Sequence, residues 1–405
     1  MRQCELFAEA LGLTEPWEVV AIEFSPEDRR LDIHIDFVRG SVFPCPVCGE
    51  AEAKPYDTAI HTWRHLDFFQ HRAYLHARVP RVQCSGGCGI RKVAVPWSRP
   101  GSGFTLLFEA FIMTLAREMP VAAIGALVDE YDTRIWRVIH HYVESARDEA
   151  DHSEVRQVAV DETASRRGHH YISLFFDLGS KRLLYGVEGR GMGAVAAFSE
   201  DLQAHGGDPL VIEQVCCDMS PAYIQGMDTH FPDAQITFDR FHIMKLMGHA
   251  VDQVRREEAR ETNLLRRTRY HWLKNPEKLT RVQRETLSAL SKHNLKTARA
   301  YPIRLTLREF FEQPDRRSGE AFLKRWYFWA THSRLAPVIE AARTIKRHWE
   351  GVLNWFAGRL NTGLLEGINS LVQAAKARVR GYRTNRNLIT MAYLIAGKLE
   401  YGLPI

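Results

Sequence analysis

The stretch Val155-Arg-Gln-Val-Ala-Val-Asp161-Glu162 is an apolar, β-type run that ends in two carboxylates, just before the polar segment Thr163-Ala-Ser-Arg-Arg167. We expect a buried strand that holds a carboxylate rigidly at a cleft, which suits a metal ligand. A second run, Leu210–Cys217, leads into Asp218 and then into Ser220-Pro221, a pair typical of a helix start. The sequence therefore predicts two aspartates, each at the end of a strand.

A third candidate carboxylate, Glu366, lies in a segment with helical periodicity. The apolar stripe of this segment consists of Leu365, Ile368, Val372, Ala375 and Val379. Glu366 falls on the adjoining polar side, and Asn361 or Thr362 is placed to cap the helix. Two strand-borne aspartates and one helix-borne glutamate can hold two divalent metals about 3.5–4 Å apart, an arrangement that activates the attacking oxygen and stabilises the leaving oxygen in phosphodiester chemistry. For each acid taken singly, an ordinary surface acid at the end of an element is the rival interpretation.

Length and composition set the broad class of the protein. The chain has 405 residues, enough for two or three domains, and is 45% hydrophobic and 25% charged, as in ordinary soluble proteins. No apolar run approaches the ~18 residues of a membrane span, and the first residues lack a signal-peptide core. We therefore expect a cytoplasmic, nucleoid-associated protein without a membrane partner. The net charge of +5 is compatible with a polyanionic partner but is too small to identify one.

Four of the seven cysteines form two close pairs, Cys45-Pro-Val-Cys48 and Cys84-Ser-Gly-Gly-Cys88. Two such knuckles can wrap one tetrahedral zinc ion with four thiolates, which leaves no open position for catalysis. Unliganded thiols are the alternative. Two alternating runs, Val19–Phe24 and Leu31–Phe37, precede the knuckles and predict a β-hairpin. We therefore predict a zinc-ribbon-like DNA-binding domain over residues 1–98, with a structural zinc.

Three short helical patterns follow a Pro- and Gly-containing linker at residues 96–103. They cover residues 104–117 and 121–130 and a helix that Asp132 or Thr133 caps. This layout is typical of a helix-turn-helix, predicted here over residues 99–150, with Arg134, Arg137 and His141 facing DNA. A generic three-helix connector fits the spacing equally well.

From Val155 the pattern changes to three strands, Val155–Glu162, Tyr171–Phe176 and Lys181–Val187, separated by turns. Helix, strand, helix and strand follow, so the order β-β-β-α-β-α-β predicts an RNase H-like α/β core. In that topology the first and fourth strands are neighbours, which selects Asp161 and Asp218. Glu162 points to the opposite face from Asp161.

The remaining segments are expected to bind DNA. Asp239 ends the last strand and is the alternative third ligand, while Arg240, His242 and Lys245 open the next helix and suit DNA phosphates. Residues 252–355 are helical and basic, with Trp272, Trp326, Tyr327, Trp329 and Trp349 among the bases. Such a region forms either a nucleic-acid groove or solvated helix faces over a tryptophan core. We predict an all-helical insertion here, which divides the core into residues 151–251 and 356–405.

The segment after Glu366 contains no acid as far as Arg386 and carries Lys376, Arg378, Arg380 and Arg383. A basic tail beside a metal-binding glutamate suits the backbone phosphates of the strand being cut. The chain as a whole is thus expected to be a multi-domain α+β protein.

Taken together, these segments resemble the bacterial insertion-sequence transposases with a DDE core, most closely the ISL-three group, over nearly the whole chain. The resemblance rests on Cys45-Pro-Val-Cys48, Trp63-Arg-His-Leu-Asp67, Val160-Asp161-Glu162, Cys217-Asp218-Met-Ser-Pro-Ala-Tyr223, Asp239-Arg-Phe-His242 and Leu365-Glu366-Gly-Ile-Asn369 with Gly381-Tyr-Arg383. It implies Asp161, Asp218 and Glu366 as the catalytic triad, binding to terminal inverted repeats, and magnesium-dependent cutting and joining. The Cys-x-x-x-Cys spacing of the second knuckle and Asn361-Thr362 before Gly363 depart from the family pattern.

The expected protein is therefore a DNA transposase with two Mg²⁺ ions, replaceable by Mn²⁺, and a structural Zn²⁺. Its partners are double-stranded DNA, at transposon ends and target, and further copies of the chain in a dimer or higher oligomer. Two rivals remain: a zinc-ribbon and helix-turn-helix regulator without catalysis, and a structure-specific nuclease with the same core.

Overall fold

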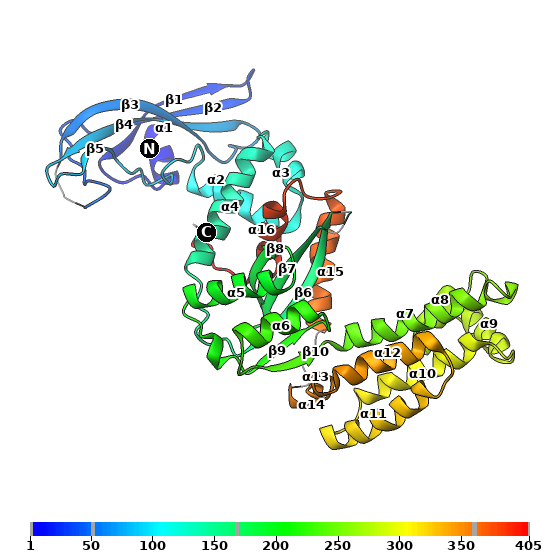
Figure 1. Ribbon diagram of the computed structural model, residues 1–405. Helices are drawn as coiled ribbons and strands as arrows, with labels where there is room; N and C mark the ends of the chain where they lie inside the picture. Colours follow the sequence, from blue (N-terminus) through cyan, green and yellow to red (C-terminus); the bar gives the residue numbers. More distant parts are fainter. Residues whose placement is uncertain (1–2, 50–52, 167, 169, 359–362, 404–405) are drawn as a thin grey trace. The chain divides into compact units, whose positions relative to one another are not determined.

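The computed structural model describes residues 3–49, 53–166, 168, 170–358 and 363–403, without the side chains of residues 363–366 and 369. The chain divides into two compact units (Figure 1): Met1–Ala146 with Glu400–Ile405, and Arg147–Leu399. In the described ranges, no helix combines the length and the apolar character needed to cross a membrane.

The first unit contains one mixed sheet. Its strands are β1 (Trp17–Ser25), β2 (Arg30–Phe37), β3 (Pro55–Arg64), β4 (Arg72–Cys84) and β5 (Gly89–Lys92), in the order β1-β2-β4-β3 with β5 paired to β4. The predicted hairpin is confirmed as the antiparallel pair β1–β2. Along β2, every second residue from Leu31 to Phe37 is buried, because successive side chains point to opposite faces. This face packs with Trp17, Trp63 and Trp97, while α1 (Gln3–Ala10) lies against β1.

Three helices follow as predicted: α2 (Leu106–Glu118), α3 (Val121–Val128) and α4 (Asp132–Asp148). The side chain of Thr105 caps α2 by accepting a hydrogen bond from the Phe108 N–H. Five residues at helical spacing form a buried apolar stripe on α4: Ile135, Val138, Ile139, Tyr142 and Val143.

The segment at residues 96–103 is not the free linker that its Pro and Gly content suggested. Trp97 and Ser98 are buried. Arg99 Nε and Ser102 Oγ donate to the carboxylate of Glu109, at 2.9 and 2.6 Å. The carboxylate of Glu109 is fully buried and also accepts from the hydroxyl of Tyr142. A buried charge that collects three donors fixes this segment against α2 and α4.

The second unit is built on a five-stranded sheet in the order β10-β9-β6-β7-β8. Its strands are β6 (Gln157–Arg166), β7 (His170–Asp177), β8 (Arg182–Glu188), β9 (Gln214–Cys217) and β10 (Gln235–Phe238). The first three are antiparallel, whereas β9 and β10 run parallel to β6. The first and fourth strands of this unit are neighbours, as predicted for an RNase H-like core.

Two strand boundaries differ from the prediction by more than two residues. β6 continues past Glu162 to Arg166, because its polar end keeps pairing with β7 up to the pair Arg166–His170. The run Leu210–Cys217 is a strand only from Gln214. Before it, the carboxylate of Asp208 accepts from the Leu210 N–H and begins a 3-10 turn, η1 (Pro209–Val211).

Helices cover both faces of this sheet (Figure 1). α5 (Met192–Ala204) and α6 (Pro221–His230) share a buried core with Val158, Val160 and Val215. α16 (Asn385–Ala396) packs on β8, where the Tyr393 hydroxyl accepts from the Gly186 N–H at 3.0 Å. α15 (Gly363–Arg378) contacts both α16 and β6.

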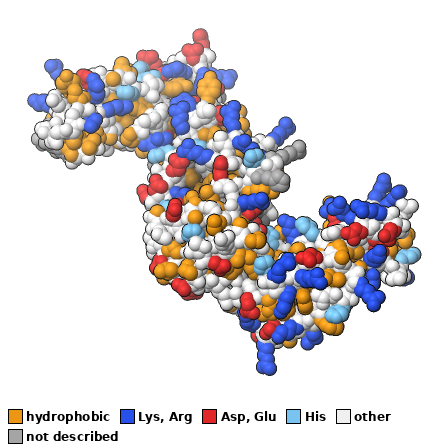
Figure 2. Space-filling view, in the orientation of Figure 1, with side chains coloured by type: hydrophobic (Ala, Val, Ile, Leu, Met, Phe, Trp, Pro, Cys, Tyr) orange, Lys and Arg blue, Asp and Glu red, His pale blue; other side chains and the backbone are white. Residues whose placement is uncertain are grey.

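A helical insertion separates β10 from α15. Its elements are α7 (Arg240–Glu258), η2 (Asn263–Leu265), α8 (Arg269–Leu273), η3 (Pro276–Lys278), α9 (Arg281–Ser291), α10 (Lys296–Phe310), α11 (Arg316–Thr331), α12 (Ala336–Arg347), α13 (Trp349–Leu353) and α14 (Trp355–Gly358). Trp272, Trp326 and Trp349 are buried in a core shared with the sheet, whereas Trp329 is exposed. The tryptophan-core alternative therefore holds for these three. On the face drawn in Figure 2, the basic side chains of this insertion are interspersed with acidic ones.

Candidate active site and metal centre

Asp161 within β6 and Asp218 directly after β9 lie at one edge of the sheet. The two strands are parallel, and Ala159 lies opposite Cys216. Two residues further along each chain come Asp161 and Asp218, so continuing this register past its last pair puts the two residues at the same level, where β9 ends. Both are half-buried. Although Asp161 is not the last residue of its strand, it lies beyond the end of the neighbouring strand, which opens this edge.

Each aspartate has a local hydrogen bond. Asp161 Oδ1 accepts from the Glu162 N–H at 2.7 Å, and Asp218 Oδ1 accepts from the Ser220 N–H at 2.9 Å. Asp239, which follows β10, is buried and caps α7 by accepting from the Phe241 N–H. An N-cap carboxylate is already stabilised by the helix, so Asp239 is a weaker candidate for a metal ligand than Asp218.

Glu162 is the acid of this edge that the sequence reasoning set aside. Burial raises its pKa, and the charge of Asp218 raises it further, with a smaller contribution from Asp161. Tyr223 on α6 and Arg190 act in the opposite direction. Strand alternation predicted that Glu162 faces away from Asp161, but its approach to Asp218 depends on the loop after β9, which no sequence pattern revealed.

Glu366 lies on α15, but its side chain is outside the described part of the structure, as are Asn361 and Thr362. The helix itself is attached to β6. Gln373 Nε2 donates to Thr163 Oγ1, and Lys376 Nζ donates to the Ala164 carbonyl oxygen. Two residues of the predicted apolar stripe, Ile368 and Val372, are buried.

A basic hollow lies where α15 meets the end of β6. It has a volume of about 690 Å³, and its lining includes Arg166, Lys376, Arg380 and Arg383. Arg380 and Gly381 adopt positive φ angles of 55° and 101°, which end the helix and turn the chain around the hollow. Arg378, Arg380 and Arg383 are exposed, and Arg166 donates to the Arg383 carbonyl oxygen. Four cations beside the strand that carries Asp161 suit a phosphate chain.

The other side chains predicted to contact DNA differ in whether they are exposed, charged and unengaged within the protein. Arg137 on α4 and Lys245 on α7 are exposed. Arg134 is engaged within the protein, at 2.6 Å from Glu130 and over the ring of Phe104. Burial lowers the pKa of His141, with Arg99 adding to the effect, so its imidazole tends to stay neutral.

Arg240 and His242, at the start of α7, are both half-buried. The guanidinium of Arg240 lies over the ring of Phe311, 5.0 Å from its centroid. The Nδ1 atom of His242 is buried and has no hydrogen-bond partner.

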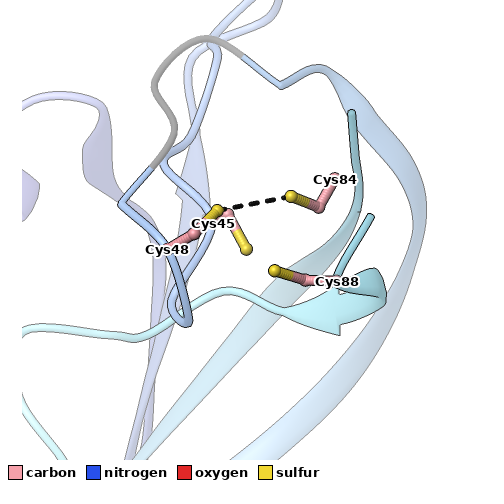
Figure 3. Close-up of side chains that lie close together, drawn as sticks. All are labelled: Cys45, Cys48, Cys84 and Cys88. Atoms are coloured by element: carbon pink, nitrogen blue, oxygen red, sulfur yellow. Dashed lines mark hydrogen bonds between the residues drawn. The ribbon is translucent and has the colours of Figure 1, made fainter. Parts of the chain in front are cut away.

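The four predicted zinc ligands lie together at one end of the first sheet. Figure 3 shows the thiols of Cys45, Cys48, Cys84 and Cys88 converging, and their sulfur atoms all lie within 4.8 Å of one another. Cys48 Sγ lies 3.4 Å from Cys84 Sγ, and none of the four thiols is in a disulfide.

The chemistry of this cluster fits zinc. Backbone N–H groups of Cys48 and Val47 lower the pKa of Cys45 to about 7, which favours the thiolate that a metal needs. Four thiolates in tetrahedral reach are a structural zinc set. Among the described side chains, the groups of three or more metal ligands within 4.8 Å are these cysteines and His152, Asp201 and His205.

Three family models match successive parts of the chain. The model described as zinc-finger of transposase IS204/IS1001/IS1096/IS1165 matches residues 41–88. The helix-turn-helix domain of transposase family ISL3 matches residues 93–143, and the DDE domain of ISL3 elements, described as Transposase, matches residues 158–392. The helix-turn-helix alternative is thereby favoured over a generic connector.

Two curated relatives are similar over most of their length. The transposase for insertion sequence element IS1557 of Mycobacterium tuberculosis is 28% identical over 445 aligned positions, covering 100% of this chain and 98% of the relative. The transposase for insertion sequence element IS1001 of Bordetella parapertussis is 27% identical over 386 positions, covering 93% and 94%.

Proposed function

The chain belongs to the ISL3 family of transposases, and from this premise we propose that it binds the terminal inverted repeats of its insertion sequence and catalyses Mg²⁺-dependent strand cleavage and strand transfer. Asp161, Asp218 and Glu366 carry the reaction. The observation that supports this most directly is the register of β6 and β9, which aligns Asp161 with Asp218 at the open edge of the sheet.

The attachment of α15 supports the third ligand. Glu366 precedes Gln373 by two helical turns, so both share one helix face, and its backbone lies roughly 10 Å back along the axis. Asp161 precedes Thr163 by two residues, roughly 7 Å back along the strand. Contacts at Gln373–Thr163 and Lys376–Ala164 show that helix and strand run in the same sense. The backbones of Glu366 and Asp161 therefore lie on the same side of these contacts, each towards the N-terminus of its element and at a similar distance.

The three proposed ligands fit magnesium because they offer carboxylate oxygens, the ligand atoms that this hard cation prefers. When bound, a pair of Mg²⁺ ions supplies activation of the attacking oxygen and stabilisation of the leaving oxygen. The protein's own part is to hold the carboxylates and the DNA backbone in place. Arg166, Arg380 and Arg383 bind phosphates at the basic hollow, and Arg137 on α4 reaches the transposon end.

The zinc-ribbon unit serves recognition in this proposal. A Zn²⁺ held by the four cysteines fixes the end of the β4–β5 hairpin to the Cys45–Cys48 knuckle, so that the first unit presents a rigid surface to DNA. All four ligand positions are filled by protein, so this metal takes no part in cleavage.

The test uses the full chain with labelled transposon ends and a target plasmid. We expect Asp161→Asn, Asp218→Asn and Glu366→Gln each to lower cleavage by at least ~10³-fold, because each removes a charged ligand of the Mg²⁺ pair that would activate the attacking oxygen, while end binding in gel shifts is retained. Asp233→Asn, an exposed acid before β10, is the matched control and should cleave normally. Cleavage retained in one of the three variants removes that residue from the site.

The same assay separates the rival functions. A regulator shifts DNA without cutting it, and a structure-specific nuclease cuts without joining. Joined products that depend on all three acids support the transposase.

A further inference from the structure

A second cluster of metal-ligating side chains lies in the second unit, outside the proposed active site. His152 lies in the segment before β6, and Asp201 and His205 are one helical turn apart at the end of α5. Each offers one ligand atom, and these atoms all lie within 4.8 Å of one another. The two imidazole rings lie 4.8 Å apart between centroids, at 33°.

The backbone holds this cluster in place. The His152 N–H donates to the His205 carbonyl oxygen at 2.9 Å, which ties the segment before β6 to the end of α5. Gly207, two residues after His205, has no room for a Cβ, because it would lie 3.0 Å from the His152 carbonyl oxygen and 2.6 Å from Leu202. The ligands are therefore organised before any ion binds.

Two buried polar atoms of the cluster have no hydrogen-bond partner: His152 Nδ1 and Asp201 Oδ2. His152 is only 3% exposed. A buried carboxylate oxygen without a partner is costly, and a bound water or ion is its usual explanation. The other oxygen, Asp201 Oδ1, accepts a hydrogen bond from Arg147, which leaves Oδ2 as the oxygen that can bind a metal.

A hydrogen bond of His205 orients its ring within the cluster. His205 Nδ1 lies 2.7 Å from the Asp201 carbonyl oxygen and 3.6 Å from Asp201 Oδ2. If Nδ1 carries the proton and donates to this carbonyl, the lone pair is on Nε2, a common second-shell arrangement for a metal-binding histidine.

We propose that His152, Asp201 and His205 form a second transition-metal site, which takes Zn²⁺ or a similar ion that prefers imidazole. Two imidazoles and one carboxylate suit zinc-type metals and not Mg²⁺. Three protein ligands leave one position of a tetrahedral ion for water. Because the guanidinium of Arg147 is bonded to the same carboxylate, the affinity is lower than that of the four-cysteine cluster. The bound ion links the segment before β6 to α5 and stabilises the second unit.

The test titrates the full chain, prepared with one Zn²⁺ per chain in the cysteine cluster, with ZnCl₂ in millimolar Mg²⁺. Magnesium occupies an all-oxygen site but does not compete for imidazole. We expect one further equivalent of Zn²⁺, with an affinity at least tenfold lower in His205→Ala and in Asp201→Asn, since loss of even a second-shell partner costs about 10–100-fold. At a free Zn²⁺ concentration of roughly 100 times Kd, the melting temperature of the second unit should rise by roughly 5–10 °C.

His293→Ala removes an exposed histidine of the insertion and should bind the second Zn²⁺ like the wild type. Wild-type chains that stop at one equivalent overturn the proposal. So does a second equivalent that survives in His205→Ala but is lost in Asp218→Asn, because the ion then lies at the catalytic carboxylates. Crystals of the wild type soaked in ZnCl₂ decide the matter without a variant: an anomalous peak among the three side chains supports the site, and a water without anomalous signal overturns it.

Discussion

Asp161 and Glu162 show what a single residue step means in a strand. They are neighbours in the chain, and alternation separates their faces. Burial raises the pKa of Glu162, and the charge of Asp218, which lies just beyond the end of β9, raises it further. The assignment of Asp161 as a ligand is a prediction from the sequence, whereas the crowding of a further acid at this edge could not be predicted from it.

Histidine burial gives the first unit a pH dependence that can be tested at one residue. Burial, aided by the charge of Arg64, lowers the pKa of His65 to about 4, and its Nδ1 lies 2.9 Å from Thr105 Oγ1. Its pKa in the unfolded chain is near 6.5, so between these values the unfolded state binds more protons. The free energy of unfolding should therefore fall by up to about 3 kcal/mol as the pH drops from 6.5 to 4.

Denaturant unfolding of the first-unit transition between pH 7 and pH 4 measures this effect. His65→Gln keeps a polar partner for Thr105 but cannot be protonated, so its profile should be flatter than that of the wild type. His293→Gln, at an exposed position, should follow the wild type. Parallel profiles for His65→Gln and the wild type would show that His65 does not carry the dependence.

At the scale of elements, regular periodicity was enough to predict most helices and strands. The stripe of α4 and the Pro221 start of α6 are local signals, and the structure has both helices. The errors arose where a distant partner decided the outcome. The polar end of β6 is a strand because β7 pairs with it, and residues 96–103 are fixed because the buried carboxylate of Glu109 accepts from Arg99 and Ser102.

The same distinction applies to the sites. The two cysteine knuckles could be predicted from spacing, because each knuckle is local. For Asp201 and His205 the spacing of one helical turn is visible in the sequence, but His152 joins them only through the fold. Glu130 lies in the turn between α3 and α4, so its ion pair with Arg134 depends on the path of that turn and could not have been recognised from helical spacing.

The attachment of α15 to β6 gives a prediction for an element. Gln373 donates to Thr163 Oγ1, two residues from Asp161, and it shares a helix face with Glu366. Gln373→Ala removes this bond without touching a catalytic acid. We expect cleavage to fall by roughly 10- to 100-fold, because a small displacement of a catalytic group costs that much, with end binding unchanged. Ser370→Ala, at an exposed position of the same helix, is the control. Equal single-turnover rates for Gln373→Ala and the wild type would mean that this contact does not position Glu366.

At the scale of the whole molecule, the charge balance is nearly even, with 54 basic and 49 acidic residues. Affinity for DNA must therefore depend on where the basic side chains lie. On the insertion many basic side chains form ion pairs, such as Arg281 with Glu285, Arg308 with Glu277 and Arg316 with Glu350. Among the residues that the structure describes, none of those lining the basic hollow at the end of α15 is acidic. The hollow, and not the insertion, is thus the better candidate for the phosphates of the cut strand.

Salt dependence tests this assignment over the whole protein. Each phosphate contact releases counterions and contributes about 0.9 to the slope of log affinity against log salt. If Arg380 and Arg383 each contact a phosphate, the double variant Arg380→Ala/Arg383→Ala should reduce the slope by roughly 2, and it should weaken binding to all sequences alike, because phosphates carry no sequence information. The matched control is Arg281→Ala/Lys292→Ala, two exposed bases of the insertion, which should leave the slope unchanged. Fluorescence anisotropy with a transposon-end duplex and a scrambled duplex, from 50 to 300 mM KCl, measures both quantities. A slope that changes only in the insertion variant would move the DNA path from the α15 hollow to the helical insertion.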